Sequence, residues 1–167
     1  MRSLMALSFA LVLVALIIAG CSEEKPPEIQ LGVDKCDMCG MIISEKNYAG
    51  LYYSTKEKRW KKFDDIGCLV MEAKKEGDAK AGTIYVFDYE TGELIKAEKA
   101  YYVVSRDIWT PMNTGIIAFK SKEKAEETAK KQGGKVMSFE ELMKMEMKMG
   151  WMGGRRSERT SMSHTGK

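Results

Sequence analysis

The chain has 167 residues, of which 44% are hydrophobic and 31% are charged, so it is long enough to bury a core and to form one domain or two very small ones. Its 27 basic and 24 acidic residues give a net charge of +3, which is too balanced for a dedicated nucleic-acid binder. The single histidine, His164, lies in the C-terminal tail, and this excludes most catalytic triads and histidine-based zinc sites. Sulfur-containing residues are unusually frequent for a chain of this length, with 13 methionines and 4 cysteines.

Residues 1–20 are predicted to be a lipoprotein signal peptide. Arg2 precedes an uncharged apolar run, Leu4 to Ile18, which has the length of a signal core and is short for a membrane span. The run ends in Ala19-Gly20-Cys21, which is typical of a bacterial lipobox whose cysteine is acylated. We therefore expect Cys21 to anchor an exported protein to the cell membrane, facing the periplasm or the cell exterior.

Residues 21–35 contain Pro26-Pro27 and several acidic side chains, a composition that predicts a tether. The body is expected over residues 36–142. The remaining segment, 143–167, is rich in methionine and basic residues and is expected to be a tail.

The first half of the body predicts two strands, a helix and a strand. Tyr48–Ser54 and Arg59–Phe63 have the composition and alternation of a β-hairpin. Asp64 or Asp65 can cap a helix that starts at Ile66 and ends at Gly77, and Thr83–Phe87 is a further strand.

The second half predicts the same order again. Tyr101–Val104 and Gly115–Phe119 are expected as strands, a helix capped by Ser121 follows, and Lys135–Met137 is a short strand. The capping box Ser138–Glu141 starts a last helix. The fold class is therefore α+β, with two small ββαβ units at about 36–90 and 91–142.

The segment Cys36-Asp37-Met38-Cys39-Gly40-Met41 is the strongest candidate site, with four sulfur atoms in six residues. Thiolate and thioether donors are soft and select Cu(I) over harder metals. In an extended segment, Cys39 and Met41 project from the same side, and Cys36 and Met38 repeat that arrangement. We expect these residues to hold Cu(I) with a third sulfur from elsewhere, for which Met112 in the loop Trp109–Asn113 is the best candidate.

Other chemistry remains open for these cysteines. A zinc site needs four ligands, whereas Cys68 is the only other thiol in the body, which has no histidine. A c-type haem site is excluded because Gly40 follows Cys39. Cys36 and Cys39 could instead form a structural disulfide, or could serve a thiol–disulfide oxidoreductase, although such a motif normally lies at the start of a helix.

Three further features have plainer interpretations. Cys68 lies in the helical run IGCLVMEA and is expected to be a small core residue. Met143–Met149 alternates methionine with charged residues, and its involvement in copper collection stays open. His164 is expected to be solvated.

The lipobox, the CDMCGM segment and the WTPMNTGIIAF stretch, followed by an amphipathic helix and a GGKV strand, resemble the NosL family. That family comprises membrane-anchored accessory lipoproteins of nitrous oxide reductase. The resemblance implies a fold of two similar ββαβ units and a Cu(I) chaperone that binds through Cys39, Met41 and Met112, with Cys36 as an additional thiol. It also implies nitrous oxide reductase as the copper acceptor.

We therefore expect a binding protein, not an enzyme, that carries Cu(I) from a lipid anchor to the reductase. The alternative functions are an extracytoplasmic thiol–disulfide oxidoreductase that uses Cys36 and Cys39, and a structural lipoprotein. The sequence also leaves a homodimer open.

Overall fold

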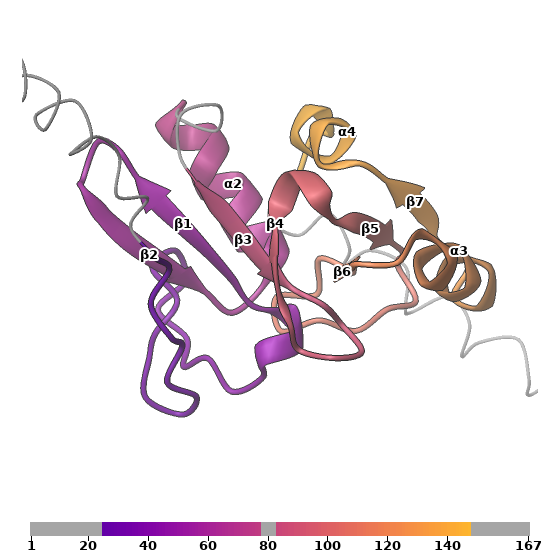
Figure 1. Cartoon of the computed structure of the whole chain (residues 1–167), viewed down its shortest axis with the longest axis horizontal. Coiled ribbons are helices and arrows are strands. Elements are labelled where there is room, and N and C mark those ends of the chain that lie inside the picture. Colours follow the sequence, from indigo (N-terminus) through magenta and orange to yellow (C-terminus); the bar gives the residue numbers. More distant parts are fainter. Residues whose placement is uncertain (1–24, 78–82, 148–167) are drawn as a thin grey trace, which may run out of the picture.

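The computed structural model describes residues 25–77 and 83–147. Its element order is two strands, a helix and two strands, then two strands, a helix, a strand and a final helix. Two small antiparallel sheets lie side by side along the long axis (Figure 1). The predicted α+β class is confirmed. No helix among the described residues is long and apolar enough to cross a bilayer, and the predicted signal peptide and Cys21 lie outside these residues.

The first sheet has the strand order β2-β1-β3-β4, and every neighbouring pair is antiparallel. The predicted hairpin of β1 and β2 is confirmed, with Gly50 opposite Phe63 and Ser54 opposite Arg59. The strands and their helix are β1 (Gly50–Ser54), β2 (Arg59–Phe63), α2 (Ile66–Glu76), β3 (Ile84–Phe87) and β4 (Leu94–Lys96). A short 3-10 helix, η1 (Lys46–Tyr48), precedes β1.

The second sheet has the order β6-β5-β7, again antiparallel. Its strands are β5 (Tyr101–Val104), β6 (Ile116–Phe119) and β7 (Lys135–Met137), with the 3-10 helix η2 (Ala97–Lys99) just before β5. Helix α3 (Lys122–Lys131) packs on this sheet, and α4 (Phe139–Lys144) lies between α2 and β5 (Figure 1).

The sequence patterns position the helix ends correctly. Asp65 caps α2 by accepting a hydrogen bond from the Gly67 N–H at 2.7 Å, and Gly77 ends the helix in a left-handed conformation with φ of 71°. Ser121 caps α3, and Ser138 and Glu141 form the predicted capping box of α4. Each of the N-terminal caps Asp65, Ser121 and Ser138 accepts a hydrogen bond from a backbone N–H that has no partner inside its helix.

One hydrophobic core joins the two sheets. Tyr52, Phe63 and Leu69 from the first half share a buried cluster with Tyr102 and Ile116 from the second. The end of β3 also reaches β6, because the Tyr89 N–H donates to the Ala118 carbonyl at 2.8 Å. The two units are therefore packed as one body.

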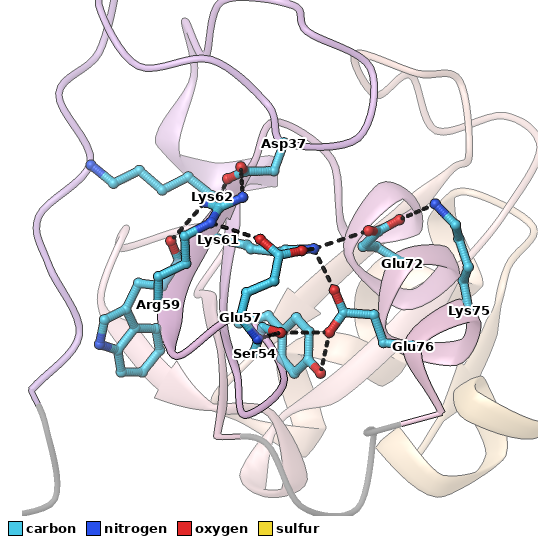
Figure 2. Close-up of polar contacts among 11 residues, drawn as sticks. Asp37, Ser54, Glu57, Arg59, Lys61, Lys62, Glu72, Lys75 and Glu76 are labelled. Carbon is cyan, nitrogen blue, oxygen red and sulfur yellow. Dashed lines mark hydrogen bonds and ion pairs between the residues drawn. The ribbon is translucent and has the colours of Figure 1, made fainter.

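A buried ion network attaches α2 to β2. The Lys61 side chain is 4% exposed, and its Nζ lies 2.6 Å from Glu57, 3.1 Å from Glu72 and against Glu76 (Figure 2). Ser54 and Tyr52 donate hydrogen bonds to Glu76 at 2.7 and 3.1 Å. Burial alone would raise the pKa of Glu76, but these hydrogen bonds, chiefly the one from Lys61, lower it to about 2. The network fixes α2 at the edge of the β1–β2 hairpin.

The structure differs from the sequence prediction in three places. Tyr48 was expected in the first strand, but it ends the 3-10 helix η1. Strand β4 was not predicted, because it has three residues and only Ile95 is buried. The segment Cys36–Met41 was expected to be extended, but it forms a turn between Lys35 and Ile42, which pair as an isolated antiparallel bridge. Gly40 adopts a φ of 76° in that turn, a conformation that glycine reaches without a side-chain penalty.

Candidate metal centre

The Cys36–Met41 turn is closed by its own backbone. The Cys36 N–H donates to the Met41 carbonyl at 2.8 Å, and the Gly40 N–H donates to the Cys36 carbonyl at 2.9 Å. These bonds hold Cys36 and Cys39 on one compact loop. Cys36 is 3% exposed, whereas Cys39 is partly buried.

Asp37 fastens this turn to strand β2. The backbone N–H of Asp37 donates to the Lys62 carbonyl at 2.8 Å, and its carboxylate accepts from the Lys62 N–H at 2.7 Å. The Arg59 guanidinium adds an ion pair with Asp37 at 2.8 Å (Figure 2). Because β2 leads through two residues into α2, the turn is held in register with the start of that helix.

The segment that leads into α2 and the first turn of that helix supply three more residues near the turn. Asp64 and Asp65 occupy the step between β2 and α2, and Cys68 is the third residue of the helix. Asp64 is 2% exposed and Cys68 is 1% exposed. The N-terminal end of a helix favours negative charge, so this is a suitable place for an ionised sulfur or carboxylate.

The turn and the helix bring four metal-binding side chains together. One ligand atom from each of Cys36, Cys39, Asp64 and Cys68 lies within 4.8 Å of all the others. The Cys39 Sγ is 3.5 Å from Asp64 Oδ1. All three cysteines are free thiols, so the cluster is available to a soft metal ion.

The three thiols have different acidities. A hydrogen bond from the Cys68 thiol, assisted by backbone N–H groups of Cys39 and Asp64, lowers the pKa of Cys36 to about 7 in spite of its burial. Burial, with a smaller contribution from the neighbouring Cys36, raises the pKa of Cys39 to about 12. The hydrogen bond to Cys36, together with burial, also raises the pKa of Cys68. In the metal-free protein, Cys36 is therefore the thiol most readily ionised.

Asp64 provides a further sign that a cation belongs here. Its Oδ2 atom is buried and has no hydrogen-bond partner among the described residues. Buried polar atoms in native proteins are nearly always satisfied, and leaving one without a partner is costly. A cation held among the neighbouring thiols would offset that cost.

A second loop closes over the start of α2. The Met112 N–H donates to Asp65 Oδ2 at 2.9 Å, and the Thr114 hydroxyl donates to Asp65 Oδ1. The loop and the helix are in close contact at Gly67. A Cβ added to this glycine would lie 2.3 Å from Thr114 Cγ2. Met112 is partly buried against the core cluster that contains Cys36 and Cys68. Asp65 therefore caps the helix and holds the Met112 loop.

Comparison with known proteins identifies the family. The NosL family model matches residues 29–147. The copper-binding lipoprotein NosL of Stutzerimonas stutzeri is 32% identical over an alignment of 152 residues, and this alignment covers 78% of this chain and 76% of that protein. The chain belongs to the NosL family. A crystal structure of the copper chaperone NosL from Shewanella denitrificans has the same fold, with a TM-score of 0.61 at 23% identity over 70% of this chain and 94% of that one.

The sulfur-bearing residues expected for a NosL protein fall into two groups. Cys36, Cys39 and Met112 lie in or against the core that surrounds the thiol cluster. Met41 is 48% exposed, and because the segment is a turn, it does not pair with Cys39 through the alternation of an extended strand. Burial raises the pKa of the Cys39 thiol, and the Met41 backbone N–H opposes part of that rise.

Sequence reasoning missed two members of this cluster. Cys68 was predicted to be a core residue, and it is buried as expected, but its sulfur also lies beside Cys36 and Cys39. Asp64 was considered only as a helix cap, a role that belongs to Asp65. The available signal was their spacing, since residues four apart at the start of a helix can share one side.

The late methionines pack on the same core as the cluster. Met143, Met145 and Met147 are partly buried against it, while Lys144 and Glu146 are exposed. Helix α4 ends at Lys144, and Met145 is extended, with its carbonyl accepting a hydrogen bond from Lys74. Met149 and His164 lie outside the described residues.

Proposed function

We propose that this protein is a Cu(I) chaperone that is tethered to the membrane through acylated Cys21 and delivers copper for assembly of the copper site of nitrous oxide reductase. The observation that carries the proposal is the buried group of thiols around Cys36 and Cys39. The names of its relatives, a copper-binding lipoprotein and a copper chaperone, support it independently.

The donor chemistry favours Cu(I). Thiolates and thioethers are soft ligands that select Cu(I), and the body offers no histidine. We assign Cys39 and Cys36 as thiolate ligands and Met112 as a thioether ligand. A thioether carries no charge, so it adds soft selectivity without binding copper too tightly for release.

Met41 has a different role in this proposal. It is 48% exposed and follows Cys39 in the turn by two residues. We assign it as an outer thioether that binds copper during transfer, when an acceptor ligand approaches from solvent. A site with few permanent ligands allows an incoming donor to bind before an old one leaves.

Cu(I) competition with a chromogenic chelator tests the binding site. Cys39→Ser and Met112→Leu should each weaken Cu(I) binding by at least about tenfold, since even groups outside the metal's immediate shell are worth 10- to 100-fold. Met71→Leu, a matched exchange at a partly buried position of α2, should leave the affinity unchanged. Met112→Leu nearly conserves volume, so thermal melts should show that it folds. Wild-type affinity in Met112→Leu would remove Met112 from the site.

Delivery needs a separate experiment. The copper content of nitrous oxide reductase should fall when the enzyme matures in cells that lack this protein, and should recover with the wild-type chain but not with Cys39→Ser. Full copper loading without the protein would contradict the proposed partner.

A thiol–disulfide oxidoreductase is the second candidate function. The lowered pKa of Cys36 favours it, because the thiolate is the attacking species. The burial of Cys36, which is only 3% exposed, argues against this function, since a substrate disulfide must reach the Cys36 sulfur. Turnover with a model disulfide, together with the reduction potential of the Cys36–Cys39 pair, distinguishes the two functions.

A further inference from the structure

We propose that Cys68 is the third thiolate ligand of the copper ion, so that Cys36, Cys39 and Cys68 supply three thiolates in addition to the Met112 thioether. This inference rests on the proposed function and adds a ligand that lies 29 residues after Cys39 in the sequence. Neither the CDMCGM segment nor the Met112 loop contains it.

The first argument is geometric. Three sulfurs that lie within 4.8 Å of one another have a common point no more than about 2.8 Å from each, which is 4.8 Å divided by the square root of three. Metal–thiolate bonds are about 2.3 Å long, as in zinc sites. Each sulfur therefore needs to move by only about 0.5 Å to bind one ion, a shift that small side-chain rotations can supply.

The second argument concerns burial. Cys68 is 1% exposed on the first turn of α2, and Cys36 is 3% exposed on the turn that faces it. Any ion that binds Cys36 deep in this cluster meets the Cys68 sulfur as a neighbour. A soft cation held there by Cys36 and Cys39 alone would leave a third soft donor unused within reach.

The third argument is the unpartnered carboxylate oxygen. Asp64 is 2% exposed, its Oδ1 is 3.5 Å from the Cys39 sulfur, and its Oδ2 has no partner among the described residues. Its position beside the three thiols indicates a positive charge at their centre. Cu(I) prefers the sulfurs, so Asp64 acts by attracting the ion and orienting Cys39.

The surrounding structure keeps the three sulfurs in place before the ion arrives. Asp37 bonds the Cys36–Met41 turn to the backbone of Lys62, and Asp65 caps the helix that bears Cys68. Neither support requires copper. The site is therefore largely preorganised, which reduces the cost of ordering it on binding.

The test uses the full chain carrying Cys21→Ser, so that Cys36, Cys39 and Cys68 are its only thiols. In this background, Cys68→Ser should weaken Cu(I) binding in chelator competition by at least about tenfold. Ala73→Ser is the matched control, because it introduces the same hydroxyl at another fully buried position of α2. Ala73→Ser should lower the melting temperature about as much as Cys68→Ser does, but it should leave the Cu(I) affinity unchanged.

A second measurement does not depend on the folding of Cys68→Ser. In the Cys21→Ser chain, Met41 and the methionines packed on this core can all be replaced by leucine, namely Met38, Met112, Met143, Met145 and Met147, so that the three thiols are left to bind the ion. X-ray absorption at the copper edge should then count three sulfurs, whereas two would overturn the proposal. Cys68→Ser that folds and binds Cu(I) within twofold of its parent would also overturn it. Failure of the parent chain to bind Cu(I) at all would instead refute the proposed function.

Discussion

Replacing Asp65 by alanine should destabilise the protein much more than the loss of an ordinary helix cap. Its carboxylate accepts from the Gly67 N–H of α2, and from the Met112 N–H and the Thr114 hydroxyl of the facing loop. Loss of the cap costs about 1 kcal/mol. Each of the two loop donors, left partly buried without a partner, adds about 1 kcal/mol or more. We expect the free energy of unfolding to fall by about 3 kcal/mol.

Ser138→Ala provides the matched control. Ser138 caps α4 at an exposed position and holds no second loop, so its loss should cost only about 1 kcal/mol. Urea denaturation of both variants, with linear extrapolation at unchanged m-values, measures the difference. Cu(I) affinity should fall in Asp65→Ala, because the Met112 loop is released, and should not change in Ser138→Ala. Equal destabilisation of the two variants would refute the idea that Asp65 clamps the loop.

Three further predictions test other parts of the molecule. Gly67→Ala should destabilise the fold by about 1–3 kcal/mol in urea titrations, because its Cβ would overlap Thr114. Glu76, with its pKa held near 2 instead of 4.5, should contribute about 3 kcal/mol at neutral pH. That contribution should be lost as the pH falls from 4.5 towards 2, and Glu76→Gln should flatten the acid limb of the stability curve. Cys21→Ala should release the protein from membranes or block its processing, and full membrane fractionation after signal cleavage would contradict acylation.

The regular elements could be predicted because their local signals agree. In α2, apolar residues recur at helical spacing between Asp65 and Gly77, and both ends have the cap that the sequence indicates. The β1–β2 hairpin combines aromatic and alternating residues on both strands. Strand β4 has no comparable pattern, because it is held to β3 by backbone pairing over only three residues.

The candidate site was harder to predict because its members are joined by tertiary contacts. The sequence identified the soft donors of the CDMCGM segment, but Gly40 reverses the chain there, and the alternation of an extended strand does not apply. Cys68 was assigned to the core from its helical neighbours. That assignment is correct as to burial. Helical neighbours could not reveal, however, that Cys68 lies beside Cys39, which is 29 residues earlier in the sequence.

The exposure of the sulfur atoms along the turn bears on how copper would leave. Cys36 and Cys68 are buried, Cys39 is partly buried and Met41 is 48% exposed, so the donors become steadily more accessible towards Met41. An acceptor ligand can reach a bound ion only from the exposed side, and α2 and the Met112 loop cover the other. If the protein transfers copper as proposed, Cys39 and Met41 would face the acceptor during ligand exchange, and Cys36 and Cys68 would release the ion last. The acceptor would then dock around Met41 and the outer face of the turn.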